Sequence, residues 1–393
     1  MTPVPHGRVG PLVARDDGSP ALDVDALLGD RGTHIIVCCG SGGVGKTTTS
    51  AALALRAAEQ GRKVVVLTID PARRLAQSMG IRKLDNVPRP VPDVAVQGGG
   101  RLDAMMLDMK RTFDEVVEGQ ASPEKAAQIL ANPFYVALSS SFAGTQEYMA
   151  MEKLGQLYAD ARRTGRWDLI VVDTPPSRSA LDFLDAPERL SSFLDGRFIR
   201  LLLTPARGPA KVMTAGLSMV TNALTKVLGA QVLRDMQTFV AAFDTLFGGF
   251  RQRAQKTYRL LQADGTAFLV VAAPEPDALR EAAYFVERLN EERMPLAGLV
   301  VNRASRTPGG HLSVERALAA AERLEEDGTD GPTAGLLRLH ADRTRIVVRE
   351  SRLRARFATT HPDVPTAVVP ALSTDVHDLD GLRVVGDLLS QRS

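Results

Sequence analysis

The chain has 393 residues, of which 44% are hydrophobic and 24% charged, so it is long enough to bury the core of one large domain. Its 48 basic and 46 acidic residues are interspersed and give a formal net charge of +2. This balance argues against a dedicated nucleic-acid surface.

The cysteines and histidines show no pattern typical of a disulfide framework or a metal site. Cys38 and Cys39 are adjacent within an apolar run, and the 6 histidines are scattered without metal spacing. The first residues lack a continuous apolar segment, and no later stretch approaches the roughly 20 apolar residues of a membrane span. We therefore expect a cytoplasmic protein with no transmembrane segment, whose residues 1–30 form a flexible N-terminal segment.

Short apolar runs rich in β-branched residues alternate with helical patterns along the chain. The runs are HIIVCC, KVVVLTID, WDLIVVD, AFLVVAA, LAGLVVN and TAVVPAL. This alternation is typical of a buried, mostly parallel sheet that is covered by helices on both faces. The sequence therefore predicts an α/β fold with a doubly wound sheet over residues 31–393.

Two interruptions of this alternation predict helical insertions, at residues 105–165 and 190–261. In the second insertion, Met213, Met219 and Met236 recur in amphipathic helical patterns. Flexible methionine side chains suit a groove for hydrophobic client segments, although core packing explains the same spacing. The Pro- and Gly-rich segments NVPRPVPDVAVQGGGR and EEDGTDGPTAG are predicted loops.

The segment GSGGVGKT follows the first apolar run and opens a helical pattern, which is the setting of a phosphate-binding loop. Glycines let several backbone N–H groups approach phosphate oxygens closely. Lys46 would reach the β- and γ-phosphates, and the Thr47 hydroxyl would bind Mg²⁺. The alternative is a plain glycine turn between strand and helix. The predicted nucleotide-binding residues of this loop are Gly40, Ser41, Gly42, Gly43, Val44, Gly45, Lys46, Thr47 and Thr48.

Two aspartates end predicted strands at the same edge of the sheet. Asp173 ends the run LIVVD, where a carboxylate would hold Mg²⁺ through a water molecule. Asp70 ends the run VVVLTID directly before a proline, which turns the chain, and it would orient the attacking water. Both aspartates have an alternative role as helix caps.

Three segments together resemble the ArsA and guided-entry ATPase family, within the deviant-Walker P-loop group. GSGGVGKTTT is similar to the phosphate loop of that family, TIDPARRLAQS to its first switch, and DTPPSRSALDFLDAPERL to its second switch. The likeness covers nearly the whole chain and is greatest to actinobacterial members described as anion-transporting ATPases. It implies a P-loop NTPase fold in which Asp70 orients water, Asp173 serves Mg²⁺, and Asn302 with the backbone near Pro370 frames the adenine. The alternative for Asn302 is an ordinary asparagine in a turn after the strand.

The chain departs from the family pattern in three respects. Ser41 stands where the family signature has a second lysine that reaches the nucleotide of a partner subunit, and a serine cannot supply that charge. The zinc-binding CxxC of the eukaryotic targeting members and the metalloid-binding cysteines of the arsenical pump are missing. Arg178 and Ser179 replace residues that are commonly glycine and histidine in the second switch.

The sequence as a whole predicts a Mg²⁺-dependent ATPase of the ArsA type that couples ATP hydrolysis to switch rearrangement and to binding a client or partner. Because Ser41 replaces the lysine, we expect a hetero-oligomer with a related chain that retains it. A homodimer that uses Arg73, Arg74 or Arg178 in cis is the alternative. The functional alternatives are a regulatory nucleotide-binding subunit with low turnover, a partition or positioning ATPase, and a phosphotransferase.

Overall fold

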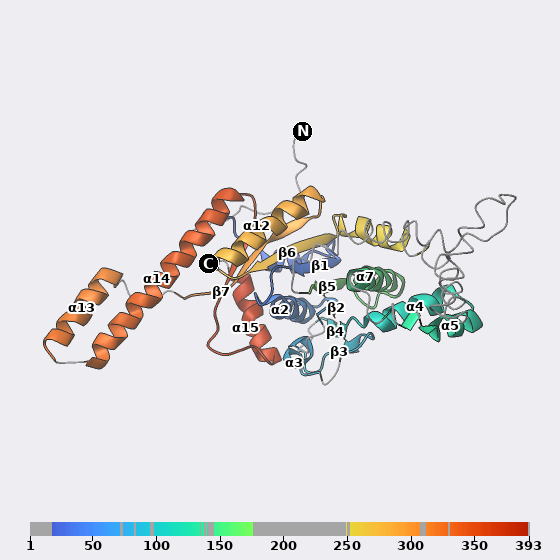
Figure 1. Cartoon of the computed structure of the whole chain (residues 1–393), viewed down its shortest axis with the longest axis horizontal. Coiled ribbons are helices and arrows are strands. Elements are labelled where there is room, and N and C mark those ends of the chain that lie inside the picture. The colour runs from blue at the N-terminus through green and yellow to red at the C-terminus, as the bar shows by residue number, and fades with distance from the viewer. Residues whose placement is uncertain are drawn as a thin grey trace, which may run out of the picture.

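In the computed structural model, one sheet with helices on both faces forms the body of the protein (Figure 1). The structure describes residues 18–391 apart from residues 71–73, 82–83, 95–97, 134, 137–138, 140–144, 176–248, 250–251, 307–311 and 329–330.

The described part of the chain contributes eight strands to this sheet, in the order β3-β4-β2-β5-β1-β6-β7-β8. All neighbouring strands are parallel except β3 and β4, which are antiparallel. The strands are β1 (Ile35–Cys39), β2 (Lys63–Thr68), β3 (Arg89–Pro90), β4 (Arg101–Met106), β5 (Leu169–Asp173), β6 (Thr266–Ala272), β7 (Leu296–Ala304) and β8 (Thr366–Pro370). The sheet confirms the predicted doubly wound α/β class.

The helices divide between the two faces of the sheet, which is why the central strands read as continuous apolar runs. On β1, Ile35 and Val37 face a core shared with α4, α7 and α12, whereas Ile36 and Cys38 face a core shared with α1, α2, α3 and α15. The helices are α1 (Val24–Gly29), α2 (Lys46–Glu59), α3 (Arg74–Ser78), α4 (Met109–Gln120), α5 (Pro123–Leu130), α7 (Thr145–Thr164), α12 (Pro276–Glu291), α13 (Val314–Glu326), α14 (Gly331–Thr360) and α15 (Leu379–Ser390). None of the helices that the structure describes combines the length and apolar character needed to cross a membrane.

The sequence analysis misses two strands. Residues 89–90 and 101 lie in the predicted loop, and residues 105–106 lie in the predicted first insertion, but they belong to β3 and β4. The segment RLDAMM does not form a continuous apolar run, because Asp103 lies in its middle. Asp103 is fully buried, where it accepts hydrogen bonds from Arg101 Nε (2.9 Å) and Trp167 Nε1 (2.9 Å). Paired in this way, a carboxylate occupies a core position.

Two further predictions about the chain ends and loops are wrong in part. Residues 18–30 are packed rather than flexible: Leu22 N donates to Thr366 O at 3.1 Å, Asp23 caps α1 by accepting from Ala26 N, and Leu28 is fully buried. The segment EEDGTDGPTAG is only partly a loop, because α14 begins at Gly331 within it. Figure 1 shows α13 and α14 lying side by side and extending beyond the sheet.

Helices α4, α5 and α7 occupy most of the predicted first insertion. Of the predicted second insertion, residues 190–248 lie outside the described residues, and residues 252–261 are helical. The boundaries of the two insertions as a subdomain stay predictions.

Candidate active site

The predicted phosphate loop connects the carboxyl end of β1 to α2 at the middle of the sheet, and its shape requires glycine at two positions. Gly40 has φ 147°, and a Cβ there would collide with the carbonyl oxygen of Val271 on β6. Gly45 has φ 96°, and a Cβ there would collide with the Asn302 side chain. L-residues rarely adopt these conformations. Between these two positions, Gly42 and Gly43 are exposed, so their backbone is accessible to a phosphate.

Lys46 lies at the start of α2 and folds back over the loop. Its Nζ donates to Ser41 O at 2.8 Å, and the side chain is only 5% exposed. Burial lowers the pKa of Lys46, and the Asp173 carboxylate opposes that shift. The ammonium group is therefore poorly hydrated, which favours exchange of the Ser41 carbonyl for a phosphate oxygen. Thr48 follows on α2 and is half-buried.

Asp173, at the end of β5, joins the phosphate loop to β2. Its Oδ2 accepts hydrogen bonds from Thr47 Oγ1 and from Thr68 Oγ1, each at 2.8 Å. Its Oδ1 is buried without a hydrogen-bond partner. Burial raises the pKa of Asp173 to about 6, against the opposing hydrogen bonds from Thr47 and Thr68 and the charge of Lys46.

This donor set fits the Mg²⁺ ion that the family resemblance implies. A hydroxyl oxygen and a carboxylate oxygen are ligands that Mg²⁺ prefers, and the ion usually keeps several waters. The orphaned Asp173 Oδ1 supplies the acceptor for such a water, and Thr47 lies beside it. The described residues contain no cluster of three or more His, Cys, Asp or Glu side chains that could hold another metal ion.

Asp70 follows β2 at the same edge of the sheet, half-buried. Its charge acts on both Lys46 and Asp173, so the structure brings these three charged groups together. The backbone before Asp70 is fixed, because Ile69 N donates to Asp173 O at 2.9 Å. Residues 71–73, including Arg73, lie outside the described residues; Arg74 starts α3 and is exposed.

Asn302, near the end of β7, contacts the phosphate loop directly. Its Nδ2 donates to Val44 O at 2.9 Å, and its Oδ1 accepts from Arg303 N at 3.0 Å. Arg303 Nη1 in turn donates to Gly43 O at 3.0 Å. Pro370 ends β8 beside β7, where it is paired in register with Ala304. The adenine contacts of Asn302 and Pro370 stay predictions; here the carboxamide buttresses the loop.

Ser41 faces an open cavity rather than the core. The cavity measures about 390 Å³, and its lining includes several carboxylates. The lining residues are Ser41, Gly42, Gly43, Val44, Ala273, Pro274, Glu275, Asp277, Ala278, Glu281, Arg303 and Glu350. A longer side chain at position 41 would therefore find room. Arg178, Ser179, Met213, Met219 and Met236 lie outside the described residues.

The sequence analysis does not single out Thr68 or Arg303, which contact site residues. Both positions carry a weak signal. Thr68 is the last residue of a buried strand, two residues before Asp70, and Arg303 directly follows Asn302. A polar side chain at the carboxyl end of a parallel strand is placed at the edge where ligands bind in such sheets.

Comparison with known proteins decides which family this site belongs to. Residues 33–308 match the sequence model of the anion-transporting ATPase family. The chain belongs to this family. The matched residues include the phosphate loop, Asp70, Asp173 and Asn302, so the resemblance inferred from the motifs is confirmed. As a member of a family of ATPases, the chain uses a nucleotide.

The relatives named below share between 24% and 31% of their residues with this chain. It is 31% identical to ATPase GET3 of Malassezia globosa over 179 residues, which are 46% of this chain and 50% of that protein. It is 26% identical to the arsenical pump-driving ATPase of Acidiphilium multivorum over 341 residues, or 85% of this chain and 51% of that protein. ATPase BagA of Mycobacterium tuberculosis is 24% identical over 380 residues, 92% of this chain and 94% of that protein. The chain thus spans about half the length of the first two relatives.

Proposed function

We propose that this ATPase hydrolyses ATP with Mg²⁺ and couples hydrolysis to a rearrangement of the segments that follow Asp70 and Asp173. One observation carries the proposal: a single carboxylate oxygen, Asp173 Oδ2, holds both Thr47 of the phosphate loop and Thr68 at the end of β2. A change at the γ-phosphate would therefore be felt at the ends of β2 and β5 together.

Each charged residue has a separate task in this proposal. Lys46 and the backbone of Gly42 and Gly43 bind the phosphates, and Asp70 accepts a hydrogen bond from the attacking water and orients it. Thr47 and Asp173 would hold Mg²⁺, which neutralises charge on the phosphate oxygens when bound. The products are ADP and phosphate.

Asp70→Asn tests the proposal, because the amide keeps the size of the side chain but weakens its hold on the water. We expect kcat for phosphate release to fall about 100-fold or more, with the Kd for ATP by isothermal titration within about threefold. Lys46→Ala should instead weaken ATP binding, because the phosphate-binding cation is lost. Asp342→Asn, on exposed α14, is the matched control and should leave kcat unchanged. Wild-type turnover by Asp70→Asn would reject the catalytic assignment.

The partner proposal depends on Ser41. The family resemblance implies a lysine at that position, which serves the nucleotide of a partner. Ser41 is uncharged, and it lines an open cavity together with Arg303 and several carboxylates. We propose that a related chain with the lysine completes the site of this chain. The name of one relative, the arsenical pump-driving ATPase, describes an ATPase that drives a pump, which supports a partner for this chain. We also propose that residues 190–261 bind a hydrophobic segment of a client protein.

A further inference from the structure

The first turn of α7 sends one side chain to the end of β2. Gln146 Nε2 donates a hydrogen bond to the carbonyl oxygen of Ile69 at 2.7 Å. The orientation of the amide follows from chemistry, since a carbonyl oxygen only accepts and the Nε2 group only donates. Ile69 directly precedes Asp70. Gln146 on α7 therefore contacts the backbone next to the proposed catalytic residue.

This hydrogen bond fixes the peptide group that leads into Asp70. The carbonyl of Ile69 and the N–H of Asp70 belong to one planar unit. Ile69 N is already held by Asp173 O at 2.9 Å. The peptide units on both sides of Ile69 are therefore held, the preceding one by Asp173 and the following one by Gln146. The direction in which the Asp70 side chain leaves the backbone depends on that plane.

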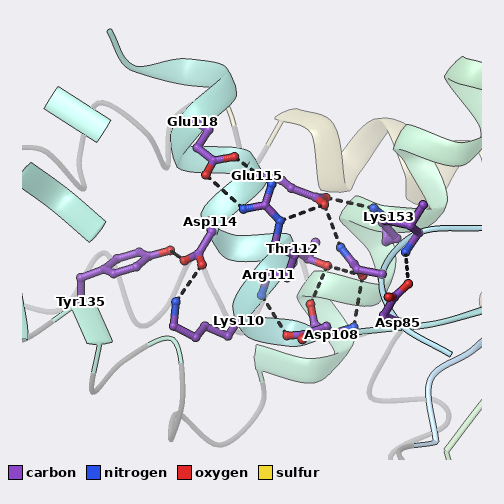
Figure 2. Close-up of polar contacts among 12 residues, drawn as sticks. Asp85, Asp108, Lys110, Arg111, Thr112, Asp114, Glu115, Glu118, Tyr135 and Lys153 are labelled. Carbon is purple, nitrogen blue, oxygen red and sulfur yellow. Dashed lines mark hydrogen bonds and ion pairs between the residues drawn. The ribbon is translucent and has the colours of Figure 1, made fainter. Parts of the chain in front are cut away.

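Helix α7 is a rigid carrier for Gln146. About one turn after Gln146, Met149 and Met151 are fully buried in the core that α7 shares with α4 and α12 on one face of the sheet. Lys153 Nζ lies 2.9 Å from Glu115 Oε2 of α4, and Figure 2 shows these two side chains facing each other between the helices. A helix anchored along its length holds its first turn in place.

The same helix is tied to the chain that returns from the predicted second insertion. Glu152, only 5% exposed, accepts from Arg253 Nε at 2.9 Å, and Arg253 belongs to the helical residues 252–261. Breaking this pair would leave the buried Glu152 carboxylate without its cation, whereas the Arg253 side chain is partly exposed. The position of Gln146 is therefore set jointly by α4, α7 and residues 252–261.

We infer that Gln146 is a positioning residue for hydrolysis: by holding the Ile69 carbonyl, it aims the Asp70 carboxylate at the attacking water. The inference rests on the proposed catalytic role of Asp70. Gln146 contacts the segment through the backbone carbonyl of Ile69. It acts through the backbone, and it transmits the position of α7 to the residue that orients the water.

Gln146→Leu removes the donor while keeping the side-chain volume roughly constant. One hydrogen bond of this kind corresponds to a loss of about 3- to 10-fold in kcat. KM and the Kd for ATP should change less than twofold, because Gln146 does not contact the phosphate loop. Gln146→Glu, which places an acceptor against the carbonyl, should lower kcat at least as much and covers the case in which the leucine variant does not fold.

The matched control lies on the same helix. Gln156 Nε2 donates to Glu152 Oε1 at 3.2 Å, so Gln156→Leu removes one glutamine hydrogen bond from α7 without touching Ile69. We expect the thermal midpoints of Gln146→Leu and Gln156→Leu to fall by similar amounts, and only the first to lower kcat. Equal loss of kcat in both variants would overturn the inference in favour of a general effect on α7.

A double-mutant cycle separates this inference from the proposed function. If Gln146 acts through Asp70, adding Gln146→Leu to Asp70→Asn should lower kcat by less than twofold further. Multiplicative losses would overturn the inference. If Asp70→Asn has a low kcat but Gln146→Leu has the wild-type kcat, the inference is overturned and the proposed function stands. If Asp70→Asn has the wild-type kcat, the proposed function is overturned.

Discussion

At the scale of single residues, Asp173 combines requirements that oppose each other. It is fully buried, which disfavours its charged form, yet the proposed chemistry needs the carboxylate. Hydrogen bonds from Thr47 and Thr68 stabilise only one of its two oxygens. The orphaned oxygen is therefore a local cost in stability that nucleotide and metal binding would offset.

The pKa of Asp173 predicts a dependence of stability on pH. Its folded-state pKa is about 6, above the ordinary value of 3.8. Between these values the folded chain binds more protons than the unfolded chain, so the free energy of unfolding falls as pH rises from about 4 to 6 and stays lower above. Asp173→Asn removes this penalty. Without nucleotide at pH 8, we expect it to raise the free energy of unfolding by about 3 kcal/mol while abolishing hydrolysis.

Chemical denaturation of both proteins at pH 4 and pH 8 checks this expectation. The advantage of the variant should shrink at pH 4, where the wild-type carboxyl group is protonated in the folded state and partly protonated in the unfolded state. A variant that is less stable than the wild type at pH 8 would show that the hydrogen bonds from Thr47 and Thr68 outweigh the cost of burial.

At the scale of elements, α7 is the link between the sheet and the helical regions. Its buried face packs on the core, and Gln146 binds the backbone of Ile69 directly after β2. Lys153 pairs with α4, and Glu152 pairs with residues 252–261. Because α7 has these three sets of contacts, we expect it to move as a rigid unit. Any motion of the second insertion with the nucleotide is therefore expected to appear at both ends of α7.

Hydrogen exchange tests this coupling. In Asp70→Asn, which is expected to hold ATP, we predict that ATP changes the exchange of residues 252–261 and of the first turn of α7 more than that of β1 and β6. The central strands exchange through global opening, whereas helix ends exchange through local opening. Helix α13, which extends beyond the sheet, serves as the internal reference. Equal protection with and without ATP throughout α7 and residues 252–261 would leave the coupling without support.

At the scale of the whole molecule, the phosphate loop carries a serine at position 41, where the family resemblance implies a lysine. The loop, Lys46 and Asp173 lie together, while Ser41 faces a cavity with Glu275, Asp277 and Glu281 in its lining. A cation donated in trans is worth roughly 10³ to 10⁵ in rate where an arginine finger supplies it. Two copies of this chain would offer each other only serine.

We predict that the isolated chain binds ATP but turns it over slowly, and that adding a related chain with lysine at the position of Ser41 raises kcat about 10-fold or more. A second arm uses Asp70→Asn in this chain, so that only the site of the relative hydrolyses ATP. Adding Ser41→Lys to it should then raise the rate of the mixture, because the new lysine acts in trans. A high kcat for the isolated chain at every protein concentration would contradict the need for a related chain with the lysine.

The sequence by itself determined the class of fold and the phosphate loop, because both depend on local patterns. Apolar runs between helical patterns require a sheet buried on both faces, and only glycine fits the backbone at Gly40 and Gly45. The location of Asp70 and Asp173 at the carboxyl edge of the sheet also followed from sequence, since each ends an apolar run. Their roles in hydrolysis stay predictions.

The tertiary structure alone decided which distant residues meet. Strand β4 escaped prediction because its central Asp103 is paired by Trp167 and Arg166, 64 and 63 residues away in the chain. The hydrogen bond of Gln146 to Ile69 spans 77 residues. Such contacts leave no period or motif in the sequence, because a polar side chain is stabilised by its partner in space rather than by its neighbours along the chain.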